Sequence, residues 1–238
     1  MIFCLGVSHK DVTQAEKWVD LVADMLRSER PYQPPLIVVA TRSANRTGLR
    51  EVQRKGQTAI RGLHVLEDED EAGYPKSASH LFLRSLEYCE KAHPGEPIMW
   101  LEPDTLPMRP NWREEIAAEY AACGRPFLGQ IERGHGPAHL CGCAVYPPNW
   151  RALAPMLGTV LTAPDIFWGP GLGQAFDTWA SPETVPQTAE AKTFQQIWRP
   201  SLPITREWLR KNVRQEAALF HQCKDGSGFK AVREMHKL

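Results

Sequence analysis

Two carboxylates follow a short apolar run in the middle of the chain. The stretch Pro97–Pro110 reads PIMWLEPDTLPMRP, in which the apolar residues Ile98 to Leu101 precede Glu102 and Asp104. An apolar run bounded by prolines predicts a short buried strand. Side chains two apart on an extended chain point the same way, so both carboxylates should project together from the strand end. Neighbouring carboxylates repel unless a cation lies between them, so we expect Mn²⁺ or Mg²⁺ here, with positions open for phosphate oxygens.

A second polar stretch follows an apolar run near the C-terminus. Residues 217–220 are apolar, and residues 221–227 read HQCKDGS. The imidazole of His221 would complete the shell of an ion held by Glu102 and Asp104, and Lys224 would neutralise a diphosphate bound to that ion. A histidine in such a string is, taken alone, more often part of a surface turn. The metal hypothesis therefore requires these separate stretches to meet.

Cysteines near both stretches offer a rival metal site. Cys141 and Cys143 are separated by one residue, and Cys223 lies two residues after His221. Three thiolates and an imidazole would bind zinc tetrahedrally. The spacings differ from those of common zinc ribbons, so we favour Cys141 and Cys143 as small residues of a buried strand.

An aspartate between aromatic residues is the candidate general base. Asp177 lies in FDTW at residues 176–179, after a stretch at 169–173 that is rich in glycine. Burial beside Phe176 and Trp179 would raise the pKa of its carboxyl toward the range that a base needs. The alternative is an ordinary aspartate at the start of a helix.

Charge is balanced over the whole chain but gathered locally. The 28 Lys and Arg residues equal the 28 Asp and Glu residues, so composition alone does not indicate nucleic-acid binding. Residues 41–61 combine several basic residues with Glu51 as their acidic partner, and residues 192–237 carry a further basic excess. Such runs are usually solvated helix faces, and a track for a phosphate backbone is the sharper interpretation.

These residues need a scaffold of alternating strands and helices. Apolar runs of strand length occupy residues 2–7, 36–40, 63–66, 98–101, 127–131 and 140–146. Helical spacing of apolar residues covers 15–26, 76–91 and 112–120. The alternation predicts an α/β fold with a mostly parallel central sheet flanked by helices on both faces. Ligands bind beyond the carboxyl ends of such strands, where residues 8–11, 67–76 and 102–104 are expected.

The length and composition suit one domain. The chain has 238 residues, of which 42% are hydrophobic. Its apolar runs are too short to span a membrane, and it opens without a secretion signal. We therefore expect a cytoplasmic protein with reduced cysteines and no membrane partner.

The ordered set of motifs resembles the GT-A fold glycosyltransferases, which use nucleotide sugars and a divalent metal. In that family a D-x-D motif at a strand end holds the metal, and EPD at 102–104 stands at that place, with glutamate first. A strand that contains glycine follows, here residues 139–147. An acidic motif then supplies the base of inverting members, which Asp177 matches, and His221 matches a C-terminal histidine that completes the metal shell. The likeness covers most of the chain.

The resemblance implies a single GT-A-like catalytic domain over residues 1–238. Residues 1–130 would bind the nucleotide sugar, and residues 131–238 would bind the acceptor and complete the metal site. The expected donor is a nucleoside-diphosphate sugar, a UDP-sugar first. Its expected contacts are Ser8, His9, Asp11, Tyr74, Lys76, Ser77 and Lys224. The expected acceptor contacts are Gly142, Trp179, Arg46 and Arg54.

The wording WLEPDTLPMRPNW, with the later AVYP and FHQCKDGS, looks most like small phage-encoded glycosyltransferases that modify hydroxymethylpyrimidines in DNA. The resemblance implies inverting, metal-dependent sugar transfer to DNA in a host cytoplasm, with the target base leaving the stack. A saccharide or protein acceptor is the first alternative. A binding protein that has lost turnover on the same scaffold and a nucleic-acid module stabilised by zinc are the others.

Overall fold

The computed structural model describes residues 1–26, 35–57, 61–66, 76–134, 137–162, 175–198, 200 and 203–238. The predicted donor contact Tyr74, the acidic residues at 67–71 and the glycines at 169–173 lie outside these ranges. Among the described residues, no helix has both the length and the apolar character that crossing a bilayer requires.

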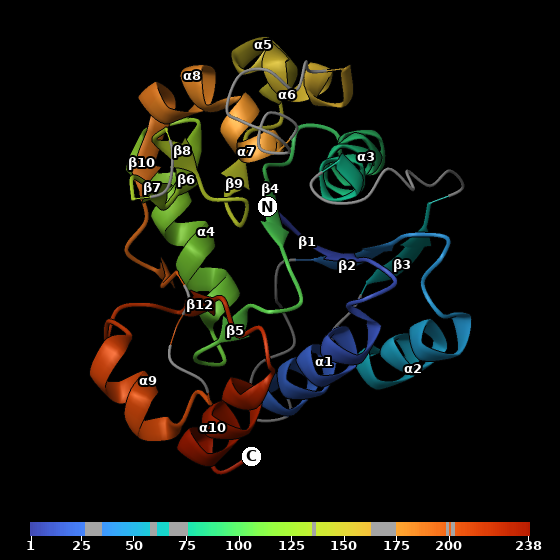
Figure 1. Ribbon diagram of the computed structural model, residues 1–238, viewed down its shortest axis with the longest axis vertical. Coiled ribbons are helices and arrows are strands. Elements are labelled where there is room, and N and C mark those ends of the chain that lie inside the picture. Colours follow the sequence, from blue (N-terminus) through green and yellow to red (C-terminus); the bar gives the residue numbers. More distant parts are fainter. Residues whose placement is uncertain are drawn as a thin grey trace.

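Helices and strands alternate through the first half of the chain (Figure 1). The α-helices are α1 (Val12–Leu26), α2 (Arg46–Gly56), α3 (Lys76–Ala92), α4 (Trp112–Cys123), α5 (Trp150–Leu153), α6 (Pro155–Thr159), α7 (Phe176–Trp179), α8 (Ser181–Thr184), α9 (Arg206–Asn212) and α10 (Ser227–His236). Two 3₁₀ turns are η1 (Val160–Thr162) and η2 (Val185–Gln187).

The strands form one large and two small sheets. Their bounds are β1 (Ile2–Val7), β2 (Leu36–Ala40), β3 (Gly62–Val65), β4 (Ile98–Leu101), β5 (Leu106–Pro107), β6 (Phe127–Gly129), β7 (Ile131–Glu132), β8 (His139–Leu140), β9 (Val145–Tyr146), β10 (Thr188–Glu190), β11 (Phe194–Gln196) and β12 (Leu219–His221). The small sheets have the orders β11-β12-β5 and β7-β8.

The central sheet has seven strands in the order β10-β6-β9-β4-β1-β2-β3. Strand β9 runs antiparallel to β4 and β6, and the other neighbours run parallel. Helices α1 and α2 lie on one face and α3 lies on the other (Figure 1). The predicted α/β fold with a mostly parallel, covered sheet is therefore confirmed.

Alternation along β1 explains the two apolar layers. Phe3 and Leu5 belong to the core that includes Trp18 of α1, whereas Ile2 and Cys4 belong to the core that includes Phe82 of α3. Successive side chains of a strand point to opposite faces, so a continuous apolar strand supplies both cores.

The sheet β11-β12-β5 brings the C-terminal part of the chain to the end of β4. Strand β12 runs antiparallel to β5, with Phe220 opposite Leu106. The amide of Cys223 then donates to the carbonyl of Asp104 at 2.9 Å. This pairing places the end of β12 beside the loop that carries the mid-chain carboxylates.

The structure differs from the sequence expectation in three elements. The strand expected over 127–131 is divided into β6 of the central sheet and β7 of the sheet β7-β8. The strand expected over 140–146 is divided into β8 and β9, because residues 141–144 form a turn in which the Tyr146 hydroxyl donates to the Gly142 carbonyl at 3.1 Å. Helix α2 was not predicted, because the stretch at 41–61 was interpreted through its charges, although Leu49 and Val52 face the core.

Candidate functional site

Glu102 and Asp104 lie where β4 ends, at the carboxyl edge of the central sheet. The Thr105 hydroxyl donates to the Glu102 carbonyl at 2.8 Å and accepts from the Trp18 indole at 3.0 Å. This turn is thereby fixed to α1. Asp104 is 7% exposed, whereas the Glu102 side chain keeps 35% of its surface in solvent. One carboxylate is buried and the other is partly exposed to solvent.

His221, the last residue of β12, meets both carboxylates. Its Nε2 lies 3.1 Å from Asp104 Oδ1 and 3.4 Å from Glu102 Oε2. On the other side of the ring, Nδ1 donates to Gln196 Oε1 at 2.9 Å. Gln196 pairs with His221 in the β11–β12 register, so this contact follows from strand pairing. A hydrogen bond at one ring nitrogen directs the other nitrogen at its target.

Lys224 places a second positive charge on Asp104. Its Nζ lies 2.6 Å from Asp104 Oδ2, while its side chain stays 60% exposed. Burial works against the charge on Asp104, but His221 and Lys224 outweigh it and hold the pKa of that carboxyl well below its ordinary value. Asp104 is therefore ionised and bridges the two cationic groups.

Burial lowers the pKa of His221, but Cys143 and Asp104 outweigh it, so that the pKa lies well above its ordinary value. These neighbours therefore favour the protonated form of the imidazole. A bound cation would take the place of that proton, since imidazole binds metals as the neutral ring.

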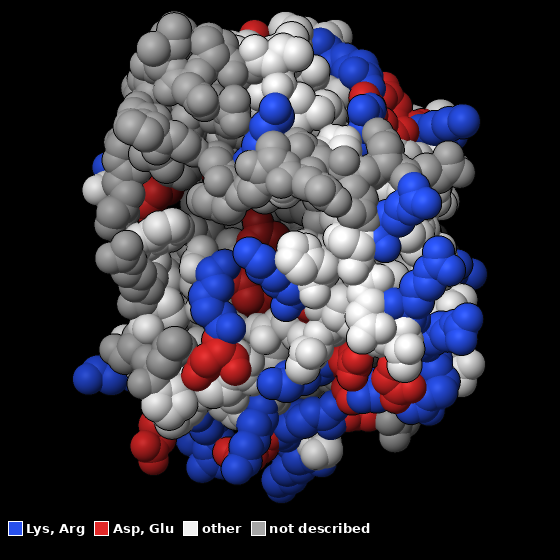
Figure 2. All heavy atoms as spheres, turned by 45° about the vertical axis from the view of Figure 1, so that its right-hand side comes forward, with Lys and Arg blue, Asp and Glu red and all other residues white. Residues whose placement is uncertain are grey.

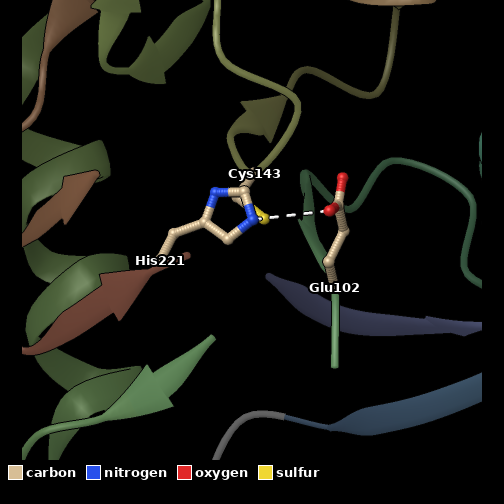
Figure 3. A group of neighbouring side chains, drawn as sticks. All are labelled: Glu102, Cys143 and His221. Atoms are coloured by element: carbon tan, nitrogen blue, oxygen red, sulfur yellow. Dashed lines mark ion pairs between the residues drawn. The ribbon is translucent and has the colours of Figure 1, made fainter. Parts of the chain in front are cut away.

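Cys143 is the third partner of His221 and Glu102. It lies in the turn between β8 and β9, and its sulfur sits beside the imidazole and opposite the Glu102 carboxylate (Figure 3). Burial raises the pKa of this thiol. The sequence analysis grouped Cys143 with His221 only in the rival zinc site with Cys141 and Cys223, and it did not predict Gln196 at the site. Neither residue belongs to a linear motif with the residues that it contacts.

The rival zinc site with three cysteines does not assemble among the described residues. Their cluster of metal-capable side chains consists of Glu102, Cys143 and His221. The sulfur of Cys223 instead accepts from the Gly228 amide at 3.3 Å.

The donor chemistry of the cluster fits a divalent cation. Glu102, Cys143 and His221 each offer one donor atom, and these atoms lie within 4.8 Å of one another. Carboxylate, thiolate and imidazole are all common ligands of divalent metals. Asp104 adds a buried carboxylate next to the same imidazole nitrogen. These residues are therefore able to hold one cation at the edge of the sheet.

Asp177 lies at the start of α7, close to this edge. A Cβ built on Gly142 would lie 3.0 Å from Phe176 Cζ and 3.2 Å from Glu102 Oε1. Because Gly142 has no side chain, Phe176, the residue before Asp177, packs close to the Glu102 carboxylate. Burial raises the pKa of the Asp177 carboxyl. The Trp179 indole, an expected acceptor contact, donates to the Thr159 hydroxyl at 3.2 Å.

The predicted donor loop lies beside the carboxylates. Strands β1 and β4 run parallel, so the loop with Ser8, His9 and Asp11 leaves the same edge as Glu102. The Ser8 hydroxyl donates to the Asp11 carboxylate at 2.5 Å, and His9 is exposed.

Lys76 and Ser77 begin α3 on the other face of the sheet. The Ser79 hydroxyl, one turn further, accepts from the Phe176 amide at 3.1 Å. The start of α3 is therefore next to α7, which carries Asp177.

The two arginines predicted at the acceptor occupy opposite ends of α2. Exposed Arg46 begins the helix next to the carboxyl edge, because β2 runs toward that edge. Arg54 lies eight residues on, about 12 Å along the helix, and forms an ion pair with Glu51. The structure therefore brings Arg46 nearer to the site edge than Arg54.

Figure 2 shows a hollow in which acidic atoms are recessed beside Lys and Arg side chains. Further basic side chains gather over the lower part of the same face. An anionic ligand would meet positive charge around such an opening.

Solved structures are similar to this chain along nearly its whole length. No protein-family model and no curated protein matches it. The galactosyltransferase LgtC in complex with donor and acceptor sugar analogues has 12% identity and a TM-score of 0.56, covering 99% of this chain and 96% of its own. Mouse xyloside xylosyltransferase 1 in its apo form has 10% identity and a TM-score of 0.56, covering 94% and 98%.

A third structure is a glycosyltransferase involved in glycosylation of the major capsid of PBCV-1. It has 12% identity and a TM-score of 0.52, covering 96% of this chain and 98% of its own. At such identities the likeness concerns the fold, and it confirms the GT-A fold that the sequence motifs implied.

Proposed function

We propose that this chain is a metal-dependent glycosyltransferase that moves a sugar from a nucleoside-diphosphate sugar to a hydroxyl acceptor. One observation carries the proposal. In a GT-A fold, an imidazole from the end of β12 lies 3.1 and 3.4 Å from two carboxylates at the end of β4, at the carboxyl edge of the sheet. That edge is where ligands bind in open α/β sheets.

We assign the residues at the carboxyl edge to metal binding and to stabilisation of the leaving group. Glu102, Asp104 and His221 would hold Mn²⁺ or Mg²⁺, which when bound supplies charge stabilisation to a leaving diphosphate. Lys224 adds an exposed ammonium beside Asp104, where it contributes positive charge toward the same leaving group.

The donor-binding loops flank this centre. Ser8, His9 and Asp11 leave the strand next to β4, and Lys76 with Ser77 begins the helix next to α7. Together with Tyr74 they are assigned to the nucleotide, for which UDP is the first candidate.

Asp177 is assigned as the base of an inverting reaction. The acceptor oxygen forms a bond to the anomeric carbon while the bond from that carbon to the diphosphate oxygen breaks. The electron pair leaves with the diphosphate, and the acceptor proton passes to the Asp177 carboxylate. Its raised pKa makes this carboxylate a better proton acceptor than an exposed aspartate.

The acceptor we assign is a hydroxymethylpyrimidine in DNA, in a phage-infected host cytoplasm. Exposed Arg46 and Arg50 on α2 and the basic side chains around the hollow support a polyanionic acceptor (Figure 2). Gly142 and Trp179 would border the flipped base. The second candidate is a saccharide acceptor, which the LgtC complex with an acceptor sugar analogue favours.

The test is transfer itself. The protein is incubated with Mn²⁺, several nucleotide sugars and DNA that contains hydroxymethylpyrimidines, and the masses of the digested nucleosides are measured by mass spectrometry. A nucleoside heavier by one sugar is the expected result. Asp104→Ala and His221→Ala should reduce transfer about 100-fold or more while circular dichroism stays unchanged. Lys224→Ala should also reduce transfer, because it removes positive charge near the leaving group. Lys230→Ala, which removes a lysine that is 85% exposed, is its matched control.

Transfer to oligosaccharides but not to DNA would replace the DNA acceptor with the saccharide. Undiminished transfer in saturating EDTA would overturn the metal assignment. If the protein neither transfers a sugar nor hydrolyses any nucleotide sugar, it is a binding protein on the same scaffold and not an enzyme.

A further inference from the structure

The cluster of metal-capable side chains, which we call the cation cluster, consists of Glu102, Cys143 and His221 and so contains a thiol that a hard metal ion does not need. Cys143 offers its sulfur to the space that Glu102 and His221 face, and the three donor atoms lie within 4.8 Å of one another (Figure 3). Mg²⁺ and Mn²⁺ favour oxygen ligands, whereas thiolates favour softer ions such as Zn²⁺. The identity of this residue therefore bears on which cation the site selects.

The spacing of two donors already suits a small tetrahedral ion. Two ligands about 2.1 Å from one zinc ion at the tetrahedral angle lie about 3.4 Å from each other. The distance from His221 Nε2 to Glu102 Oε2 is 3.4 Å. These side chains need little movement to share one ion, and the sulfur lies within 4.8 Å of both donor atoms.

The imidazole is held in the orientation that a metal ligand needs. Gln196 Oε1 accepts from His221 Nδ1 at 2.9 Å, so Nε2 faces the cluster. A polar partner on the far nitrogen is the usual outer support of a metal-bound histidine. Lys224 lies 2.6 Å from the other oxygen of Asp104, and Cys143 is the third member of the cluster of metal-capable side chains.

We propose that Glu102, Cys143 and His221 form a mixed carboxylate–thiolate–imidazole site that selects Zn²⁺, Co²⁺ or Cd²⁺ over Mg²⁺ and Mn²⁺. Three protein ligands leave the fourth position open, as in catalytic zinc sites. The inference rests on the proposed function in taking the same cluster as the cation site, which would accept Mn²⁺ or Mg²⁺ but bind the softer ions more tightly. This preference is measurable without turnover.

The test is metal binding to the full chain after treatment with a chelator. Cd²⁺ and Co²⁺ are titrated into the protein, and thiolate-to-metal charge-transfer absorption is recorded. A band that saturates at one equivalent is expected in the wild type. Cys143→Ser and Cys143→Ala should lose the band. They should also bind Zn²⁺ at least about tenfold more weakly, a loss typical even of an outer partner. Mn²⁺ affinity, measured by electron paramagnetic resonance, should change little.

The matched control is Cys141→Ser, which removes a thiol two residues away and should keep the band. Circular dichroism reports whether each variant folds, and the alanine variant serves if the serine variant does not. Absence of a band in the wild type would overturn the inference, as would a band that survives in the Cys143 variants. Wild-type affinities for Mn²⁺ and Zn²⁺ that are equal would do the same.

Failure of the two proposals is distinguishable. A thiolate band in a protein that never transfers sugar would refute the proposed function and leave the thiolate site standing. Sugar transfer without any thiolate band would refute only the thiolate site.

Discussion

At the scale of single residues, Asp104 connects the two cationic groups of the site. It is ionised although buried, because His221 approaches one oxygen at 3.1 Å and Lys224 the other at 2.6 Å. Removing one partner from such a group leaves a buried charge without compensation, which is costly. The site is thus held as a unit, so a group that orients one of its members is a further place to test it.

Gln196 is the orienting residue that tests this view. Gln196→Ala removes the acceptor for His221 Nδ1, and the imidazole is then free to turn. We expect metal affinity to fall about 10- to 100-fold, measured by competition with a chromophoric chelator. Gln195→Ala is the control, because Gln195 bonds the backbone at Asn212 and Arg214 instead. Equal losses in both variants would contradict an orienting role.

We expect the ionised Asp177 carboxylate to lower the stability of the fold while serving as the base. Its folded-state pKa is raised by burial above the ordinary 3.8, so the folded chain holds this proton more tightly than the unfolded chain. Its contribution to stability therefore falls as pH rises from about the ordinary value through the raised one. Asp177→Asn should lose transfer and should be relatively more stable at pH 8 than at pH 4.

Urea unfolding of the wild type and the Asp177→Asn variant at both pH values measures this difference, because the other titrating groups are common to both proteins. A stability difference that does not vary with pH would contradict the raised pKa.

Sequence reasoning identified polar residues that follow apolar runs. Glu102, Asp104, His221 and Lys224 were all proposed as one cluster, and the structure brings them together. Gln196 was not predicted because its contact depends on the β11–β12 register, which no local pattern encodes.

At the scale of elements, close approaches at glycine position the site. Gly142 lets Phe176 of α7 and the Glu102 carboxylate come together, since an added Cβ would lie 3.0 and 3.2 Å from them. Gly6 of β1 has a Cβ position only 1.9 Å from the ring of Trp100 on β4. These contacts explain why the strands and α7 approach so closely at the edge.

Gly142→Ala should therefore impair function more than folding. Its methyl group displaces Glu102 or Phe176 by a few tenths of an ångström, and we expect transfer to fall about tenfold, short of the ~100-fold that a 1 Å misplacement can cost. Gly62→Ala is the matched control, because nothing lies within 4 Å of its Cβ position. Initial rates and thermal unfolding of both variants are compared. Equal rates in the two would show that the approach at Gly142 does not matter.

The elements were predicted where periodicity is unambiguous. Strands β1, β2 and β4 lie at the expected residues, since each is a continuous apolar run covered on both faces. The 140–146 segment divides because some of its apolar residues lie in the turn between β8 and β9. Apolar character alone does not distinguish turn residues from strand residues.

At the scale of the molecule, neutral overall charge conceals an uneven surface. Basic side chains gather on the face that contains the acidic hollow (Figure 2). Arg46 and Arg50 are exposed on α2, one helical turn apart. A DNA acceptor would neutralise such charges and release counterions.

The Arg46→Ala/Arg50→Ala double variant tests this surface. We expect weaker DNA binding, with the slope of log affinity against log salt reduced by about two, because each phosphate that a side chain neutralises adds about 0.9 to the slope. Fluorescence anisotropy with a labelled duplex gives the slope. Lys91→Ala, an exposed charge at the end of α3, is the control and should leave the slope unchanged. A slope unaffected by the double variant would favour a saccharide acceptor.

The measurement that addresses the central claim is calorimetric binding of UDP to the wild type and to His221→Ala, each with Mn²⁺ and with EDTA. We expect the wild type to bind UDP in Mn²⁺, and we expect this affinity to fall at least about tenfold in EDTA and by the same factor in the variant. Equal UDP affinity with and without the cation, or in the variant, would contradict the convergence of β4 carboxylates and the β12 imidazole on one ion.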